Sequence, residues 1–484
     1  PTARLGLAPA RRAPAPSPAP APAPAPGGRG MGRAAGARSV ARAAAGLRLG
    51  FLGLLGLAGA TLRDFDESAG LPQAACAGAG GATLRALGVR GGTGEGALRA
   101  LAVWDAVYFV RVCECGYEQE RFFAFFPGLP LAMRALSHAL AVVLPLSPRA
   151  SCSLAGLIIS YAACVVAAVG LFRLGEVLLR DSVAARRAAL LFCVNPASPF
   201  YAAAYTEASF AALTFWGLFF LSRAGSAGWE EKRRRENPSP GSMAVVDEAR
   251  AVALFTAAAA VRSNGVVLCI FLAAHRLRAF AARPVGSVAR SALVLAVEAA
   301  LVLLPSAAFQ RYGYAQLCGP AAPTPRPWCS AGGLPSVYAF VQGEYWGVGL
   351  FRYWQAKQLP NFALAAPSLG LAALGTAGFL RRVPFSACTG FWFLGKRGPA
   401  RPPAPRRGLF VPEMAPFFFH WALLASTALL VMNVQVATRF LSACPALYWF
   451  TDSLRGRARF WAHAFFLTYA LAGSVAFANF YPWT

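Results

Sequence analysis

Charged side chains are scarce in this sequence. Only 14% of its 484 residues are charged, whereas an ordinary soluble domain carries about 25%. Hydrophobic residues make up 57%, and apolar runs of about 20 residues, enough to cross a bilayer core of ~30 Å, recur along the chain. This combination excludes a soluble enzyme, a disordered scaffold and a disulfide-rich secreted domain. It predicts an all-α polytopic membrane protein.

Acidic residues are fewer still, 20 against 46 Lys and Arg, which leaves a formal net charge of +26. Such a charge would suit nucleic-acid binding only if the basic residues gathered on one surface. They instead border apolar spans, as the positive-inside rule expects of cytoplasmic loops. The clusters lie at 232–235, 381–382, 396–407 and 455–459, besides the N-terminal arm. We therefore expect no nucleic-acid partner.

Metal-binding patterns are also missing. The four histidines are far apart and no CxxC motif occurs among the eleven cysteines, so we expect no metal site. Most cysteines lie in apolar runs, where they act as small hydrophobic residues. Cys318 and Cys329 flank a proline-rich loop, and a disulfide between them is expected only if that loop is extracytoplasmic.

The apolar runs divide the chain into an N-terminal arm and one membrane domain. Residues 1–30 are Pro/Ala-rich and predict a disordered arm, with Met31 as an alternative start, and residues 31–484 form the domain. A first span over 41–62 follows arginines that place the N-terminus in the cytoplasm. About ten or eleven crossings are expected, with large non-cytoplasmic loops at about 63–122 and 312–358. The further spans are near 124–146, 154–179, 185–203, 205–222, 249–274, 287–310, 361–380, 411–433, 436–451 and 460–481.

The first large loop contains the densest group of candidate site residues. Trp104, Asp105 and Tyr108 precede a run of phenylalanines. A partly desolvated aspartate beside aromatic faces suits a general base in a sugar site. An interfacial aromatic belt with an N-capping aspartate explains the same residues equally well. Asp64 and Asp66 form a DxD pair after the first span, but acids at helix ends are common.

Three further charged residues interrupt or border apolar segments. Glu207 follows a break at Asn195-Pro196 and is either a helix cap or a group aimed into a cavity. Arg262 interrupts an apolar stretch, and a buried arginine needs an anionic partner such as a carboxylate or a phosphate. Arg439 carries the same ambiguity, with snorkelling to the interface as its alternative.

Several blocks of sequence resemble the PIG-V class of GPI mannosyltransferases and keep the order of that family from about residue 64 to the end. They are WDAVYF (104–109), FFAFFPGLPL (122–131), LLFCVNPASPF (190–200), AYTEASFAALTF (204–215), VRSNG (261–265), YWGVGLFRYW (345–354), QLPNFALAAP (358–367), VQVATRFL (434–441) and FYPWT (480–484). Residues 1–40 and 69–100 have no clear counterpart. The segments 223–248 and 396–407 look specific to this chain.

The resemblance implies a GT-C-like helix bundle in the endoplasmic reticulum membrane with a luminal active site and no cofactor. It implies transfer of the second mannose, α-1,6-linked, from dolichyl-phosphate mannose to the mono-mannosylated GPI precursor. An inverting single displacement would use Asp105 as the base, with Asp64 as the alternate and Asp66 third. Arg262 and Arg439, helped by Asn264, would meet the departing phosphate. Trp104, Tyr108 and Glu207 complete the expected substrate site.

Two other classes of function are compatible with the residues alone. A lipid transporter or flippase would place ionisable groups in symmetry-related broken helices. A non-catalytic subunit of a membrane complex would not need the cluster of acidic and aromatic residues. The sequence leaves open whether a small partner subunit is required in addition to the surrounding membrane lipids.

Overall fold

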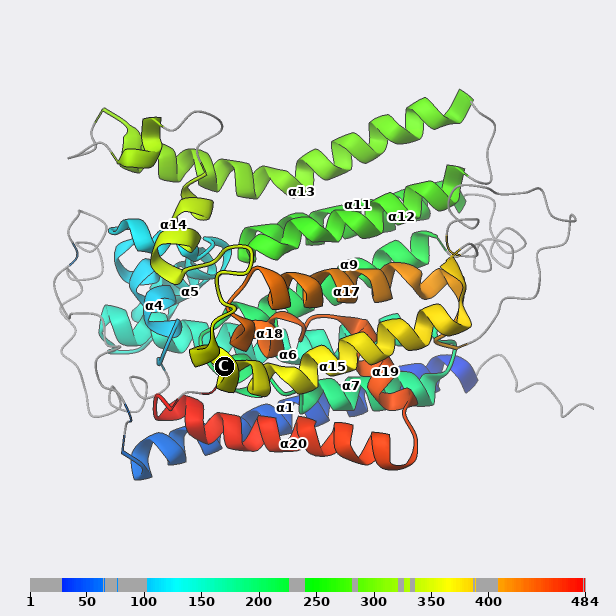
Figure 1. The fold of residues 1–484 in the computed structure, drawn as a ribbon, viewed down its shortest axis with the longest axis horizontal. Coiled ribbons are helices and arrows are strands. Elements are labelled where there is room, and N and C mark those ends of the chain that lie inside the picture. The colour runs from blue at the N-terminus through cyan, green and yellow to red at the C-terminus, as the bar shows by residue number, and fades with distance from the viewer. Residues whose placement is uncertain are drawn as a thin grey trace, which may run out of the picture.

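The computed structural model describes residues 28–63, 65, 76, 102–225, 240–280, 286–320, 326–330, 336–385, 388, 408–481 and 483. These residues form helices and connecting turns, and no strand occurs among them. Figure 1 shows the longer helices running side by side across one bundle. The all-α architecture expected from the sequence is confirmed.

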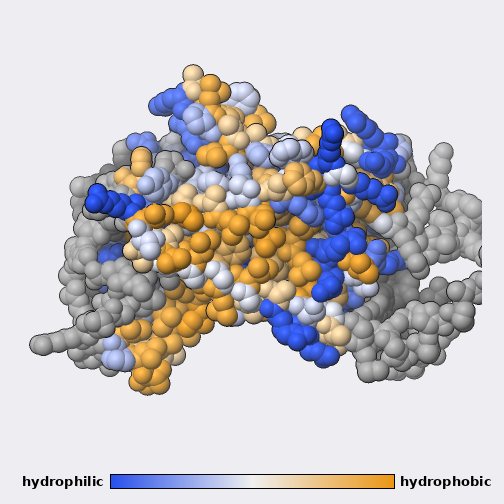
Figure 2. Space-filling model, turned by 90° about the horizontal axis from the view of Figure 1, so that it is seen from below, coloured by the Kyte–Doolittle hydropathy of each residue, from blue (hydrophilic) through white to orange (hydrophobic). Residues whose placement is uncertain are grey.

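Six helical segments are long and apolar enough to cross a membrane, judged by length and composition. Figure 2 shows hydrophobic side chains across the middle of one face and hydrophilic ones gathered towards one end. The protein is therefore a multi-pass membrane protein, and the expected ten or eleven crossings stay a prediction. The six segments are α1 (Gly28–Thr61), α6 (Pro148–Leu178), α13 (Gly286–Cys318), η6 and α15 (Ala356–Gln358, Leu359–Arg382), η7 and α17 (Pro412–Met414, Ala415–Leu430), and α20 (Gly456–Ala478).

Helix α1 begins earlier than the sequence predicted. Its first residue is Gly28, so residues 28–30 are helical rather than part of a disordered arm. Residues 31–45 contain few helix-breaking residues and much alanine, and this explains why the helix extends beyond the apolar span. The rest of the predicted arm, residues 1–27, lies outside the described residues.

Three predicted spans are broken by irregular backbone. The first, over 185–203, divides into α7 (Ser182–Cys193) and α8 (Ser198–Ala202) before α9 (Thr206–Ala224). The second, over 249–274, contains α11 (Pro240–Val261), the 3-10 turn η4 (Ser263–Leu268) and α12 (Cys269–Phe280). The third, over 436–451, contains η8 (Val434–Val436), α18 (Ala437–Phe440) and α19 (Pro445–Ser453). Irregular backbone at membrane depth is tolerated where protein buries it or where it lines a cavity.

A fully buried arginine supports the first of these breaks. Arg48 of α1 donates from Nη1 to the Ser198 carbonyl (3.0 Å), and from Nη2 to the Ser198 hydroxyl (3.1 Å) and the Cys193 carbonyl. Cys193 ends α7, where the helix dipole is negative, so these carbonyls offset the buried positive charge. The Asn195 side chain closes the turn by accepting from the Ala197 N–H (2.8 Å).

The two segments expected as large loops contain short helices. The first holds α4 (Ala106–Cys115) and the 3-10 turn η3 (Glu120–Ala124), which precede α5 (Gly128–Val143). The second holds η5 (Pro327–Ser330) and α14 (Val337–Trp346). Disulfides join Cys76 to Cys115, Cys113 to Cys152 and Cys318 to Cys329. The last pair is the one considered from the sequence.

Basic residues gather at the opposite end of the bundle. Arg187 at the start of α7 pairs with Asp452 at the end of α19 (2.7 Å), and Arg186 donates to the Ser39 hydroxyl of α1 (3.1 Å). At the other end of the bundle, the C-terminal ends of α1 and α20 meet, where the Phe65 N–H donates to the Asn479 carbonyl (2.9 Å). The bundle therefore has the short helices and disulfides at one end, and the arginines of α7 at the other.

Candidate active site

A cavity of about 310 Å³ opens where the three broken segments meet the short helices. Its walls come from the start of α4, the start of α9, the turn η4, one side of α14 and the segment from η8 to α18. This volume lies at the lower end of the range for small-molecule sites. Aromatic rings from Phe125, Phe126 and Trp346 line it beside charged and amide side chains.

Asp105 occupies the N-cap position of α4, but its carboxylate makes no capping hydrogen bond. The preceding residue, Trp104, has φ of 54°, in the left-handed region that bulky residues rarely adopt. Its indole N–H donates to the Phe477 carbonyl (3.1 Å), and the Asp105 backbone N–H donates to the Tyr205 hydroxyl (2.8 Å). These contacts fix the backbone so that the carboxylate turns into the cavity instead of capping the helix.

Arg439 of α18 is the partner of that carboxylate. Its Nη1 donates to Asp105 Oδ2 at 2.7 Å, and its Nε lies 3.9 Å from Glu207 Oε1. Nε is buried and has no hydrogen bond in the described part of the protein. Arg439 therefore faces two carboxylates and retains a buried donor for a further acceptor.

Arg262 forms the second ion pair of the cavity. Its Nη1 donates to Glu207 Oε1 and to the Thr206 hydroxyl (3.1 Å). The Glu207 side chain is only 2% exposed, whereas that of Asp105 is 27% exposed. Two arginines and two carboxylates give the cavity a formal charge close to zero, so an entering anion can compete for the arginines without crossing a net negative charge.

Neutral polar groups line the remaining walls. Asn433 donates to the Trp346 carbonyl (3.2 Å), and Gln435 accepts from the Tyr353 hydroxyl. Glu120 holds α14 from outside the cavity by accepting from the Trp328 indole (2.7 Å) and the Tyr345 hydroxyl (3.0 Å). Burial and the Glu120 carboxylate raise the pKa of Tyr345, so this phenol stays protonated and donates.

The structure brings most of the predicted site residues to this cavity. Those that line it are Trp104, Asp105, Glu207, Arg262, Asn264 and Arg439. Tyr108 does not line it and stacks on Phe125 with ring centroids 4.7 Å apart. Asp64 and Asp66 lie outside the described residues. Asp105 and Glu207 contact the cavity as charged partners of arginines, which distinguishes them from simple helix caps.

A model of the family described as "Mannosyltransferase (PIG-V)" matches residues 91–484 of the chain. The chain belongs to this family. A similar protein in Mus musculus, named GPI alpha-1,6-mannosyltransferase 2, is 35% identical over 388 residues, which are 74% of each chain. The Homo sapiens protein of the same name is 33% identical over 388 residues, again 74% of each chain. The GPI mannosyltransferase 2 of Chaetomium globosum is 32% identical over 80% of this chain and 82% of its own.

A weak structural likeness joins this mannosyltransferase to a solved structure, the oligosaccharyltransferase of Archaeoglobus fulgidus. The likeness has a TM-score of 0.39 at 14% identity and covers 89% of this chain and 55% of the other. The chain thus spans about half the length of that enzyme, and a TM-score this low assigns neither fold nor function. Of the three classes of function that the sequence left open, membership of the mannosyltransferase family supports a glycosyltransferase, not a transporter or a non-catalytic subunit.

Several residues of the mannosyltransferase site carried no recognised role in the sequence. Tyr205, which holds the Asp105 backbone, is two residues before the predicted Glu207, and its position in the block AYTEASF is the signal that could have identified it. Gln435 likewise lies in the block VQVATRFL, whereas Gln342 and Asn433 line the cavity without such a signal, because single amides in apolar sequence form no motif. Arg48 could have been noticed as a charge inside the first span.

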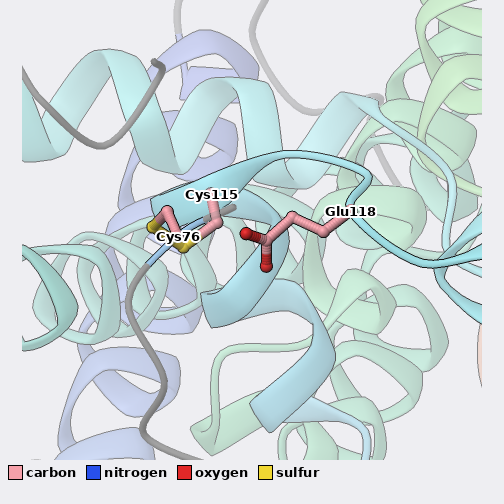
Figure 3. A group of neighbouring side chains, drawn as sticks. All are labelled: Cys76, Cys115 and Glu118. Carbon is pink, nitrogen blue, oxygen red and sulfur yellow. A yellow bond between two sulfur atoms is a disulfide. The ribbon is translucent and has the colours of Figure 1, made fainter. Parts of the chain in front are cut away.

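A group of potential metal ligands among the described residues lies at the C-terminal end of α4, away from Asp105. Ligand atoms of Cys76, Cys115 and Glu118 lie within 4.8 Å of one another. Figure 3 shows that the two sulfurs are joined as a disulfide, so neither is available as a thiolate ligand. Glu118 also pairs with Arg111 of α4 (2.8 Å). The group therefore fixes the end of α4, the helix that begins beside Asp105.

Proposed function

We propose that this protein transfers the second mannose, in α-1,6 linkage, from dolichyl-phosphate mannose to the mono-mannosylated GPI precursor. The proposal is supported by the names of the relatives, GPI alpha-1,6-mannosyltransferase 2 in mouse and human. The cavity adds a chemical reason, because it combines an accessible carboxylate with two arginines and aromatic walls. A base, cations that can meet a phosphate and flat apolar faces for a sugar suit transfer from a sugar phosphate bound to a lipid.

The observation that carries the mechanism is the difference between the two carboxylates. Asp105 is the more exposed and lies at the start of a helix beside the cavity, whereas Glu207 is enclosed by Arg262 and Thr206. A general base must reach the hydroxyl whose proton it takes. Asp105 is therefore the proposed base, and Glu207 positions the arginines.

The proposed reaction is a single displacement with inversion, because a β-linked donor gives an α-linked product. The acceptor hydroxyl oxygen attacks C1 of mannose while its proton moves to the Asp105 carboxylate. The bond between C1 and the phosphate oxygen breaks, and the electron pair leaves with dolichyl phosphate. The phosphate gains one negative charge in this step, so preorganised cations would stabilise the transition state.

Arg262 and Arg439 are proposed to meet this charge, with Asn264 as a neutral donor beside them. The Nε of Arg439 fits this role because it is a buried donor without a hydrogen bond, 3.9 Å from its nearest carboxylate oxygen on Glu207. As phosphate charge grows, Arg439 can shift its interaction from Asp105 to phosphate, just as Asp105 becomes protonated and loses its own charge. The donor has no diphosphate to neutralise, so this mechanism requires no metal cofactor.

We place the cavity in the lumen of the endoplasmic reticulum, with the N-terminus in the cytoplasm. Disulfides form in oxidising compartments, and apart from Cys76 their cysteines belong to the short helices, the start of α6 and the end of α13. The opposite end holds the arginines that start α7 and end α15, as cytoplasmic ends do. The orientation predicted from charge and the position of the disulfides support the same topology.

The function is tested in cells that lack the endogenous enzyme. We expect a GPI precursor with one mannose to accumulate and this chain to convert it to the two-mannose species. In isolated membranes, radiolabelled dolichyl-phosphate mannose should label that product, and GDP-mannose should not when synthesis of the lipid donor is blocked. Accumulation of complete precursors, or direct use of GDP-mannose, would overturn the proposal.

A further inference from the structure

One face of α14 forms part of the cavity wall. Tyr338, Gln342 and Trp346 follow one another at four-residue spacing, which places them in one stripe along the helix. All three line the cavity. The proposed reaction assigns none of them a role.

Both ends of this stripe are fixed to other walls of the cavity. The Tyr338 hydroxyl is 2.8 Å from the Ser263 hydroxyl of η4, and the Trp346 carbonyl accepts from Asn433 at 3.2 Å. The Tyr338 backbone N–H donates to the Gln310 side chain of α13 (3.1 Å). The stripe is therefore held in place relative to Arg262, the neighbour of Ser263.

Gln342, in the middle of the stripe, differs from most of the polar residues around it. Asn264, which the proposed reaction already uses, is the other cavity amide whose side chain makes no hydrogen bond within the described residues. Asp105, Glu207, Ser263, Asn433 and Gln435 all hydrogen-bond to protein. The side-chain amide of Gln342 has no protein hydrogen bond in the described part of the chain, although it lies half-buried in the cavity wall. A partly buried amide offers two donors and an acceptor, which need partners.

We propose that Gln342 and Trp346 bind the sugar that is transferred, and that Gln342 thereby contributes to donor specificity. The amide would hydrogen-bond one or two ring hydroxyls, and the Trp346 ring would pack against the C–H face of the sugar. This inference rests on the proposed function and refines it by assigning the sugar-binding wall.

The donor sugar is the better occupant because of its connection to phosphate. A phosphate held by Arg262 has its sugar one bond away, and Arg262 is adjacent to the residue that anchors α14. The sugar would then lie between η4 and α14, with its C1 open to an acceptor near Asp105. The acceptor glycan has no such link to this wall.

The test is a thermodynamic cycle that combines a change of the Gln342 side chain with removal of single hydroxyls from the donor sugar. The kcat/KM for mannose transfer is measured with short-chain polyprenyl-phosphate mannose and its 2-, 3-, 4- and 6-deoxy analogues, for the natural chain and for Gln342→Leu. Removing the hydroxyl that Gln342 binds should lower kcat/KM about tenfold or more in the natural chain, and much less in the variant. Donor KM should rise in Gln342→Leu, while acceptor KM should stay the same.

Glu344→Gln is the matched control, because Glu344 is exposed on the same helix. This substitution should leave unchanged the ratio of kcat/KM for the mannose donor to kcat/KM for each deoxy analogue. Gln342→Asn keeps the amide but shortens it, and should give an intermediate loss even if Gln342→Leu folds poorly. Equal losses for every deoxy donor in the natural chain and both variants would overturn the inference while leaving the proposed function intact. Failure of the natural chain to use the mannose donor at all would overturn both.

Discussion

Arg439 and Asp105 are 334 positions apart in the sequence, and their side chains form an ion pair of 2.7 Å. Each comes from a segment that departs from regular helix, Asp105 after the strained Trp104 and Arg439 in a short helix between two breaks. The pair therefore exists only when both segments are correctly placed. Its geometry links the proposed base to a proposed phosphate ligand.

Arg439→Lys tests the proposed role of Arg439 as a phosphate ligand. Lysine keeps the charge but cannot span Asp105, Glu207 and a phosphate with one planar group. We expect kcat/KM for mannose transfer to fall about 10- to 100-fold, as charge-assisted hydrogen bonds of roughly 1.5–3 kcal/mol imply. Arg457→Lys, at an exposed position on α20, should behave as the natural chain. Equal rates for all three would exclude Arg439 from the reaction.

The close packing of η4 gives a prediction about Gly265. A Cβ at this position would lie 2.5 Å from the Cα and N atoms of Ala259, which are backbone atoms that cannot turn aside. We expect Gly265→Ala to cost about 1–3 kcal/mol and to displace Arg262, with a large loss of transfer activity.

Gly370→Ala is the matched control. Gly370 lies in α15 and a Cβ there meets nothing within 4 Å. It should retain activity and gain about 0.5–1 kcal/mol of stability. Equal effects of the two substitutions on thermal denaturation in detergent would contradict the close packing of Gly265 against Ala259.

How much of this site follows from the sequence can be judged from such residues. Asp105, Glu207, Arg262 and Arg439 were identifiable because a charge in an apolar chain is conspicuous and costly. The pairing of these charges could not be identified, because no local pattern specifies which charges meet across hundreds of residues. Likewise Gln342 became visible only when its neighbours' hydrogen bonds were known.

The fold shows the same limit. Hydropathy located the apolar segments, since composition alone determines whether a segment can enter a bilayer. Asn195-Pro196 and Arg262 marked two of the three breaks, but hydropathy did not show that all three would meet at one cavity, where hydrogen bonds such as those of Arg48 and Asn195 support irregular backbone. The helix α14 was also missed, because a long aromatic loop and a short interfacial helix have similar composition.

Arg48 provides a test of stability. Arg48→Met removes three hydrogen bonds to the break between α7 and α8 but keeps an apolar side chain in the core. We expect the free energy of unfolding to fall by at least about 2 kcal/mol, with KM for donor and acceptor nearly unchanged. Arg42→Met, at an exposed position on the same helix, should not alter the denaturation temperature. An unchanged denaturation temperature for Arg48→Met would contradict this role.

The disulfide between Cys113 and Cys152 joins α4 to α6. Replacing both cysteines by serine should lower stability by about 2–4 kcal/mol, seen as a lower denaturation temperature. Cys269→Ser, at a free cysteine, serves as the control. Alkylation of Cys113 in the natural chain without prior reduction would show that the bond is not formed in the membrane.

The most direct test of the account is the transfer rate of Asp105→Asn under saturating donor and acceptor. Asparagine preserves the shape of the side chain but cannot accept the proton of the acceptor hydroxyl. The control is Asp181→Asn, because Asp181 caps α7 through the N–H groups of Val183 and Ala184 and asparagine caps a helix equally well. We predict a loss of at least about 100-fold for Asp105→Asn, with the protein still folded and present at normal level, and none for the control. Transfer by Asp105→Asn at the rate of the natural chain would contradict the central claim that Asp105 is the base.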